Sequence, residues 1–241
     1  MIKRLGRFAY RYVYGLAASI YLLTIGQTSA RHRSFLYRLI SHFGYQPVKT
    51  LVPVTPLDEV ISRQTALEIH DPLGAGGNVS LLELAVIGSL IHRGNPARLM
   101  EIGTLDGRTT LNMAANSAPH AAIFTLDLPD QPSGTCLIGH PLAAKITQIS
   151  GDSTKFDWSP YNGTLDFVFV DADHTYPFVL SDSRQALKLL RDGRGTIMWH
   201  DYATWDWEGT TRALNDLYVE GQAFSRLRHI AGTSLVYLTL D

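Results

Sequence analysis

Five apolar segments of this 241-residue sequence end in an acidic residue. One acid in such a place often serves as a turn former or helix cap. Five in succession favour a ligand site, because carboxylates accept hydrogen bonds from hydroxyl and ammonium groups and bind hard metal ions. The acids are Glu101 in RLMEIG, Asp127 in AIFTLDL, Asp152 in KITQISGD, Asp171 in LDFVFVDAD and Asp201 in GTIMWHD.

The elements that position these acids alternate between strands and helices. DFVFV is apolar on both faces, as the central strands of a parallel sheet are. Ser80 followed by Glu83 forms a capping-box signature that begins a helix running to about residue 92. We predict a doubly wound, Rossmann-like α/β sheet, mostly parallel, with a C-terminal antiparallel hairpin and an N-terminal helical extension. The expected strands are 98–103, 122–128, 145–152, 165–173 and 195–201, the hairpin 224–240, and the helices 80–92, 107–117, 176–192 and 208–219.

The turn after the first of these strands has the spacing G-x-x-x-G at Gly103 and Gly107. It lacks the G-x-G-x-x-G that holds a pyrophosphate on a helix N-terminus. Glu101 beside this turn would repel a diphosphate and attract an amine, while Asp127 is placed to bind a ribose diol. A ligand with a ribose and a positive charge describes S-adenosylmethionine (SAM) better than NAD.

Residues 78–240 resemble class I SAM-dependent methyltransferases, in particular the metal-dependent small-molecule O-methyltransferases of the catechol and macrolide-sugar (macrocin, mycinamicin) types. EIGTLDGRTT is similar to the first motif of that family. The resemblance implies that Glu101 lies near the methionine amine, that Asp127 holds the ribose, and that Asp152 and Ser153 read the adenine. The whole implied cofactor set is Glu101, Gly103, Thr104, Gly107, Thr109, Asp127, Asp152, Ser153 and Asp171.

FVFVDADHTY together with IMWHDY resembles the two metal-bearing strand ends of the family. The resemblance implies that Asp171 and Asp201 hold a divalent cation. Oxygen ligands of this kind suit magnesium, manganese or calcium, and we favour magnesium, with manganese as the alternative. His200 stands where the macrolide-sugar relatives use an acid, so the third ligand is open between His200, Asp173 and water. An imidazole ligand would move the preference from magnesium towards manganese or a later metal. His200 can instead be a buried strand-end histidine bonded to the backbone.

His174 follows Asp171 by three residues, where the catechol type places a lysine base and the macrolide-sugar type a histidine. This implies that His174 and Asp171 are catalytic. A cation on Asp171 would lower the pKa of an acceptor hydroxyl, and His174 would take its proton. The alternative for His174 is a solvent-facing loop histidine.

The acceptor is a small-molecule hydroxyl, with a sugar or natural-product glycoside favoured and a catechol still open. Aromatic residues of WHDYATWDWEGT can stack on such a ring or fill the core, and the glycine loop DPLGAGGN at 71–78 can be a lid or a plain helix entry. The aromatic candidates are Trp199, Tyr202, Trp205 and Trp207.

Two other classes of protein stay open: an NAD-dependent oxidoreductase, and a non-catalytic, membrane-associated scaffold.

The charges divide the chain into two parts. Residues 1–57 hold eight of the 21 Lys and Arg residues and no acid, which leaves 13 basic against 22 acidic residues in 58–241. That acidic balance argues against a nucleic-acid substrate. We therefore expect a basic extension at 1–57, ending in a proline-rich linker at 47–57, and a methyltransferase domain at 58–241.

The uncharged stretch 12–30 has three interpretations: a membrane span, a cleaved signal, or a helix that lies on a membrane surface or packs on a partner subunit. We favour the third, with peripheral membrane contact through residues 1–40 and a homo-oligomer. The single cysteine, Cys136, fits a reducing, cytoplasmic compartment.

Overall fold

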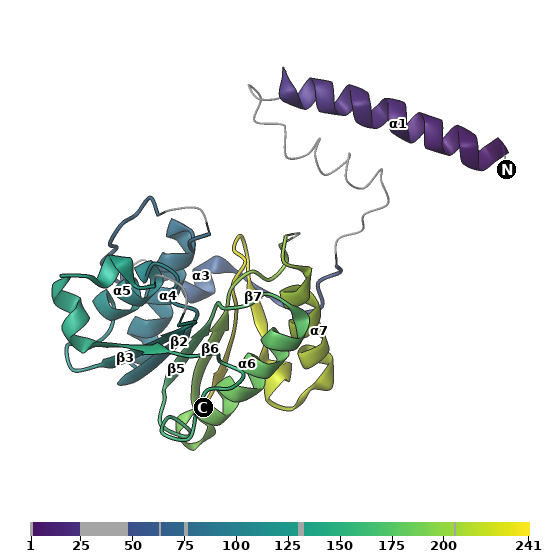
Figure 1. Cartoon of the computed structure of the whole chain (residues 1–241). Coiled ribbons are helices and arrows are strands. Elements are labelled where there is room, and N and C mark those ends of the chain that lie inside the picture. The colour runs from purple at the N-terminus through teal and green to yellow at the C-terminus, as the bar shows by residue number, and fades with distance from the viewer. Residues whose placement is uncertain (1, 25–47, 63, 75–76, 130–132, 205) are drawn as a thin grey trace. The chain divides into compact units, whose positions relative to one another are not determined.

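The computed structural model describes residues 2–24, 48–62, 64–74, 77–129, 133–204 and 206–241 (Figure 1). The chain divides into two units, Met1–Pro47 and Val48–Asp241. In the first unit, helix α1 runs from Ile2 to Leu23. Residues 25–47, which belong to the expected N-terminal extension, lie outside the described residues. Among the helices that the structure describes, none is long and apolar enough to cross a membrane.

The second unit is built on one eight-stranded sheet of order β1-β7-β8-β6-β5-β2-β3-β4. All neighbouring pairs are parallel except those of β8, which runs antiparallel to β6 and β7. This confirms the predicted fold class, including the C-terminal hairpin. The strands are β1 (Val54–Thr55), β2 (Arg98–Ile102), β3 (Ala122–Asp127), β4 (Ile146–Ser150), β5 (Phe167–Val170), β6 (Gly195–Trp199), β7 (Arg228–Ile230) and β8 (Val236–Leu240).

Helices cover both faces of the sheet, with α4 and α5 on one side and α6 and α7 on the other (Figure 1). The central strand β5 shows why: Phe167 and Phe169 enter one hydrophobic core, while Val168 and Val170 enter the other. A strand that is apolar on both faces must be covered on both. The helices are α3 (Leu57–Val60), α4 (Leu81–Gly94), α5 (Arg108–Ala115), α6 (Tyr176–Leu189) and α7 (Glu208–Glu220), with short 3-10 turns at Thr135–Leu137, Pro141–Lys145, Arg191–Gly193 and Gln222–Arg226.

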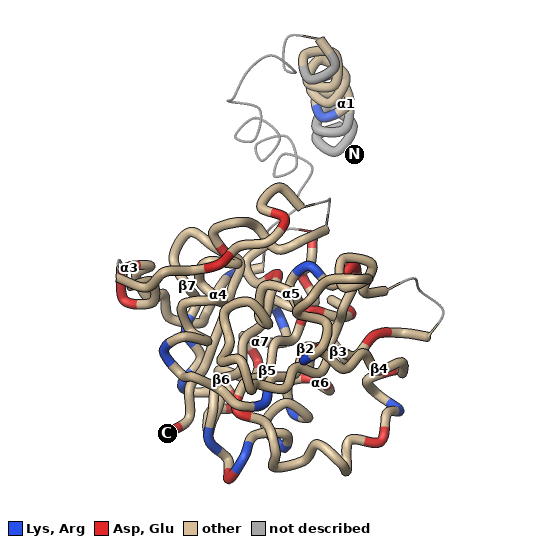
Figure 2. Tube along the Cα trace, turned by 90° about the vertical axis from the view of Figure 1, so that its left-hand side faces the viewer, with Lys and Arg blue, Asp and Glu red and all other residues tan. Residues whose placement is uncertain are grey.

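The N-terminus of α4 carries the predicted capping box. The Ser80 hydroxyl accepts a hydrogen bond from the amide of Glu83, and the Glu83 carboxylate accepts one from the amide of Ser80. Acidic and basic residues are both scattered over the second unit (Figure 2).

The second unit begins about ten residues before the expected boundary at residue 58. Strand β1 pairs with β7, so the proline-rich segment contributes a two-residue edge strand to the sheet. Prolines at 53 and 56 flank this strand, and proline is tolerated in sheets at edges of this kind. The amides of Leu51 and Val52 also donate to the buried hydroxyl of Tyr202, each at 3.1 Å.

Removing that hydroxyl tests whether this segment belongs to the folded unit. Tyr202→Phe leaves the amide of Val52 without its acceptor and should lower the free energy of unfolding by about 1 to 3 kcal/mol, measured by urea denaturation. The matched control is Tyr218→Phe, a partly buried tyrosine on α7, with a change within about 0.5 kcal/mol. Equal effects of the two variants would contradict this assignment.

Candidate functional site

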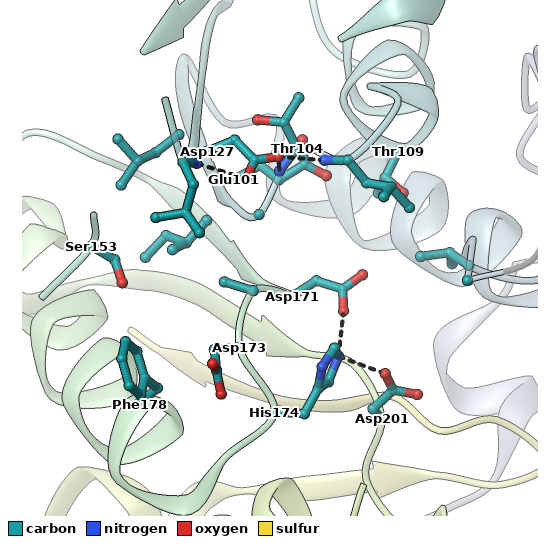
Figure 3. A pocket seen from close by; sticks show the side chains of 18 of the residues that line it. Glu101, Thr104, Thr109, Asp127, Ser153, Asp171, Asp173, His174, Phe178 and Asp201 are labelled. Atoms are coloured by element: carbon teal, nitrogen blue, oxygen red, sulfur yellow. Dashed lines mark hydrogen bonds and ion pairs between the residues drawn. The ribbon is translucent and has the colours of Figure 1, made fainter. Parts of the chain in front are cut away.

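A cavity of about 780 Å³ opens at the carboxyl ends of the parallel strands (Figure 3). It lies where the chain order reverses, because β2 pairs with β3 on one side and with β5 on the other. Ligands of open α/β sheets bind at this switch point. The lining includes most of the predicted site residues: Glu101, Gly103, Thr104, Thr109, Asp127, Asp152, Ser153, Asp171, His174 and Asp201. Of the remaining predicted residues, Gly107 is the N-cap of α5, and His200 is buried behind the lining.

The turn after β2 is held against the neighbouring strands. Gly103 has φ +101°, and a Cβ there would collide with the carbonyl oxygen of Asp171, so glycine is needed for the close approach of β2 to β5. The carboxylate of Asp127 accepts hydrogen bonds from the amides of Thr104 (3.1 Å) and Leu105 (2.7 Å). Asp127 therefore fixes the glycine turn while it also lines the cavity.

Glu101 is a buried acid at the end of β2. It accepts hydrogen bonds from the hydroxyls of Thr110 and of Thr125, its neighbour on β3, the second at 2.9 Å. Burial raises the pKa of Glu101 to about 8, against the lowering effect of these hydrogen bonds and with a smaller contribution from the charges of Asp171 and Asp127. The carboxyl group thus carries a proton at neutral pH, and a cation in the cavity would favour its ionised form.

Asp152 and Ser153 lie in the loop after β4. The Asp152 carboxylate accepts hydrogen bonds from the ammonium group of Lys155 at 2.7 Å and the hydroxyl of Thr154 at 2.6 Å. These bonds, first of all that from Lys155, lower the pKa of Asp152 to about 2. The loop therefore presents an ionised acid and a serine to the cavity.

On the opposite wall, side chains from the ends of β5 and β6 form an acid and histidine cluster. Ligand atoms of Asp171, His200 and Asp201 all lie within 4.8 Å of one another. Asp173, the other candidate third ligand, is not part of this group. Its carboxylate accepts a hydrogen bond from the amide of Thr175 at 2.6 Å. Asp201 has φ +61°, a strained conformation for a residue other than glycine, and such strain gathers at functional sites.

His200 is only 8% exposed, and its ring contacts carboxylates on both sides. Nδ1 lies 3.2 Å from Asp171 Oδ1 and 3.5 Å from Asp201 Oδ2, while Nε2 lies 3.4 Å from Glu83 Oε2. Against the effect of burial, these acids, first of all Asp171, raise the pKa of His200 to about 11. His200 is thus a buried histidine at the end of a strand, as the alternative expected, but its ring faces carboxylates and not the backbone.

His174 faces the same two acids from the loop after β5 (Figure 3). Its Nε2 lies 2.8 Å from Asp201 Oδ2 and 3.6 Å from Asp171 Oδ1. The contacts lack hydrogen-bond geometry, so we treat them as ion pairs. Against burial, Asp171 and Asp201 raise the pKa of His174 to about 9. His174 is thus a cavity residue and not a loop histidine facing solvent.

The aromatic candidates that the structure describes lie in different environments. Trp199 and Tyr202 are fully buried core residues, and Trp205 lies outside the described residues. Trp207 lines the cavity and stacks on the His174 ring, with centroids 4.3 Å apart and an interplanar angle of 21°. The glycine loop contributes Gly77 and Asn78 to the lining, whereas its residues 75 and 76 are not among the described ones.

Phe178 and Glu83 are among the residues at the site that the sequence does not assign to it. Phe178 on α6 lines the cavity, and no motif marks it. Glu83 was predicted as a helix cap, but its contact with His200 joins residues 117 positions apart and has no local signal.

The pKa of Glu101 predicts how stability depends on pH. The folded protein keeps a proton on Glu101 that the unfolded chain releases above pH 4.5, so this group lowers stability as the pH rises from 4.5 to about 8. Glu101→Gln removes the titration and keeps a hydrogen-bond acceptor. Its free energy of unfolding relative to wild type should therefore increase between pH 5 and pH 8, measured in the ligand-free protein.

The exposed acid Glu59 on α3 supplies the control, since Glu59→Gln should follow the wild-type pH profile. His174 also lowers the free energy of unfolding as the pH rises from 6.5 to about 9, because the folded protein keeps a proton that the unfolded chain releases. This contribution is the same in wild type and in both variants. Parallel profiles for Glu101→Gln and wild type would show that Glu101 is ionised in the folded state.

One family model and several solved structures are similar to this chain. Residues 100–202 match the family model of a methyltransferase domain. The fold is similar to an O-methyltransferase of Streptomyces achromogenes involved in tomaymycin synthesis, in complex with SAM (18% identity, 68% of this chain and 82% of that chain, TM-score 0.51).

Two further solved structures share the fold. One is a putative O-methyltransferase of Klebsiella pneumoniae (18% identity, 69% and 83% covered, TM-score 0.56). The other is an O-methyltransferase of Bacillus cereus in complex with S-adenosylhomocysteine (16% identity, 69% and 84% covered, TM-score 0.54). No curated protein shows a significant sequence match. Residues 100–202 are thus similar to a methyltransferase domain, and the second unit shares the fold of solved O-methyltransferases.

Proposed function

We propose that this protein transfers a methyl group from SAM to a hydroxyl of a small molecule, with a divalent cation and a histidine base beside the acceptor. The observation that carries the proposal is the division of one cavity into two walls. Glu101, Thr104 and Asp127 form one wall, and Asp171, His174 and Asp201 form the other (Figure 3).

The first wall suits the cofactor. When bound, SAM supplies a methyl group on a sulfonium. Glu101 is a buried acid whose raised pKa would fall beside the cofactor's ammonium group. Asp127 lines the cavity beside the turn, where its carboxylate, besides the amides that it already accepts, could accept a ribose hydroxyl. SAM and S-adenosylhomocysteine bound to proteins of the same fold support this assignment.

The second wall suits a divalent cation. Two carboxylates and one imidazole converge there, a donor set typical of manganese and related metals and compatible with magnesium. A cation held by Asp171, Asp201 and His200 would supply a Lewis acid that lowers the pKa of a nearby hydroxyl.

His174 is the group that would take the acceptor proton. With a pKa of about 9 in the ligand-free protein, it is protonated at neutral pH because it faces Asp171 and Asp201. When those carboxylates serve as metal ligands, they no longer stabilise the proton on the ring, so His174 becomes neutral and can accept one at Nε2.

The acceptor would lie against Trp207, which is stacked on His174 and 45% exposed. An aromatic face beside a proton acceptor suits a sugar ring or a planar ring that carries a hydroxyl. We favour a sugar or natural-product glycoside. Phe178 and Ser153 also line the cavity (Figure 3), and an adenine would fit between the loop after β4 and helix α6.

Substitution of Asp171 should change the rate of methyl transfer much more than the affinity for the cofactor. Asp171→Asn should lower turnover roughly 100-fold or more, because a metal ligand and a partner of the base are both lost, while the Kd for S-adenosylhomocysteine changes only a few-fold. Methyl transfer from labelled SAM to a panel of sugar and catechol acceptors, with magnesium or manganese, measures the first quantity.

Asp157→Asn is the control, since this exposed acid is not among the residues that line the cavity. It should keep turnover within a few-fold of wild type. Full activity of Asp171→Asn, or of wild type in EDTA, would exclude the proposed role of the cation.

We further propose that α1 lies on the surface of an anionic lipid bilayer. With 3.6 residues per turn, positions 9, 13, 16 and 20 share one apolar face, while positions 4, 7 and 11, all arginine, share the opposite face. Val13, Leu16 and Ile20 are 64%, 54% and 57% exposed. An apolar stripe on a helix within a segment of eight cations and no acid is typical of a membrane-surface helix.

Co-sedimentation of the whole chain with phosphatidylcholine vesicles, with and without phosphatidylserine, tests this surface. Wild type should bind the anionic vesicles, and Leu16→Glu should bind roughly tenfold more weakly, as expected for losing one buried leucine. Ser19→Glu adds the same charge away from the apolar stripe and should cost less. Self-association through α1, seen as a concentration-dependent mass that Leu16→Glu abolishes without any vesicle binding, would contradict the proposal.

A further inference from the structure

Glu83 joins three separate elements of the fold with one buried carboxylate. At the start of α4, its Oε2 accepts a hydrogen bond from the amide of Ser80 at 2.9 Å. Its Oε1 accepts two from Ser234 in the turn between β7 and β8, from the amide at 2.8 Å and from the hydroxyl at 2.7 Å. Oε2 also lies 3.4 Å from His200 Nε2 at the end of β6.

Helix capping alone does not account for this arrangement. A capping-box glutamate needs only the N-cap amide, which is satisfied here by Ser80. Glu83 is instead buried, and burying a carboxylate is costly unless it is paired and hydrogen-bonded. Both of its oxygens are engaged, and the one charged partner among the described residues is His200.

The His200 ring lies between two acidic groups on opposite sides. Nε2 faces Glu83, while Nδ1 faces Asp171 Oδ1 at 3.2 Å and Asp201 Oδ2 at 3.5 Å. A proton on Nε2 directed at Glu83 leaves Nδ1 as the atom available to the cluster. Histidine ligands of metal ions commonly donate their second ring N–H to a carboxylate in this way, which fixes the tautomer and the ring orientation.

We propose that Glu83 is a positioning residue that holds His200 with Nδ1 directed between Asp171 and Asp201, ready to bind a divalent cation. The inference rests on the proposed function, of which it specifies the third ligand and its support. Ser234 and Ser80 fix Glu83 in turn, so α4 and the β7–β8 turn together set the geometry of the cluster.

The experiment titrates Mn²⁺ into the ligand-free whole chain by calorimetry. Glu83→Gln keeps the shape of the side chain and an oxygen that accepts the hydrogen bonds of Ser234. The NH2 group then faces His200, and as a donor it cannot accept the Nε2 proton. The Kd for Mn²⁺ should rise roughly 10- to 100-fold relative to wild type. Ser80→Ala, which breaks the capping box on the hydroxyl side and leaves the contact with His200, is the matched control and should bind Mn²⁺ as wild type does.

A double-mutant cycle separates positioning from a general loss of structure. In a His200→Asn background, Glu83→Gln should cause no further loss of Mn²⁺ affinity, whereas a structural role would add its full effect again. If Glu83→Gln does not fold, Ser234→Ala replaces it in the cycle with a smaller expected loss.

The possible results separate the positioning role of Glu83 from the proposed cation site and from the methyltransferase function. Wild-type Mn²⁺ affinity in Glu83→Gln, or additive losses in the cycle, would overturn the positioning role alone. No Mn²⁺ binding by wild type would overturn the proposed cation together with this inference, while S-adenosylhomocysteine binding, titrated in the same samples, would show whether the methyltransferase function still holds.

Discussion

The structure depends on giving partners to the carboxylates that follow the strands Arg98–Ile102, Ala122–Asp127, Phe167–Val170 and Gly195–Trp199 at one edge of a buried sheet. Parallel strands deliver their carboxyl ends to the same edge, so acids that follow successive strands meet in one cavity. Unpaired charges cannot be buried there. Asp127 is satisfied by backbone amides, Glu101 by threonine hydroxyls and a raised pKa, and Asp171 and Asp201 by two histidines.

In this ligand-free state, protonated side chains lie where the proposed function needs bound cations. Glu101 keeps a proton where an ammonium group would lie, and His174 and His200 are charged where a divalent ion would bind. Binding of the cofactor and the metal would then release protons, because each ligand brings the positive charge that the carboxylates require. The need of these carboxylates for positive charge thus accounts both for the pKa shifts and for the positive charge of the proposed cofactor and metal ion.

Much of this edge could be predicted from the sequence, because it follows from local patterns. Apolar runs on both faces identify the central strands, and the residue after each run must lie at the ligand edge. What could not be predicted involves contacts between distant segments. The pairing of Val54 with β7 converts an apparent linker into an edge strand, and the contact of Glu83 with His200 arises only when α4 meets β6. Trp199 and Trp207 look alike in the sequence, and only packing separates a core residue from a cavity residue.

The most direct test of the central claim is a calorimetric titration of the purified whole chain with S-adenosylhomocysteine, with NADH as the comparison, each with magnesium and with EDTA. The cavity described here predicts binding of S-adenosylhomocysteine and none of NADH, with proton release near neutral pH as Glu101 becomes ionised. Binding of NADH, or of neither ligand, would contradict the account.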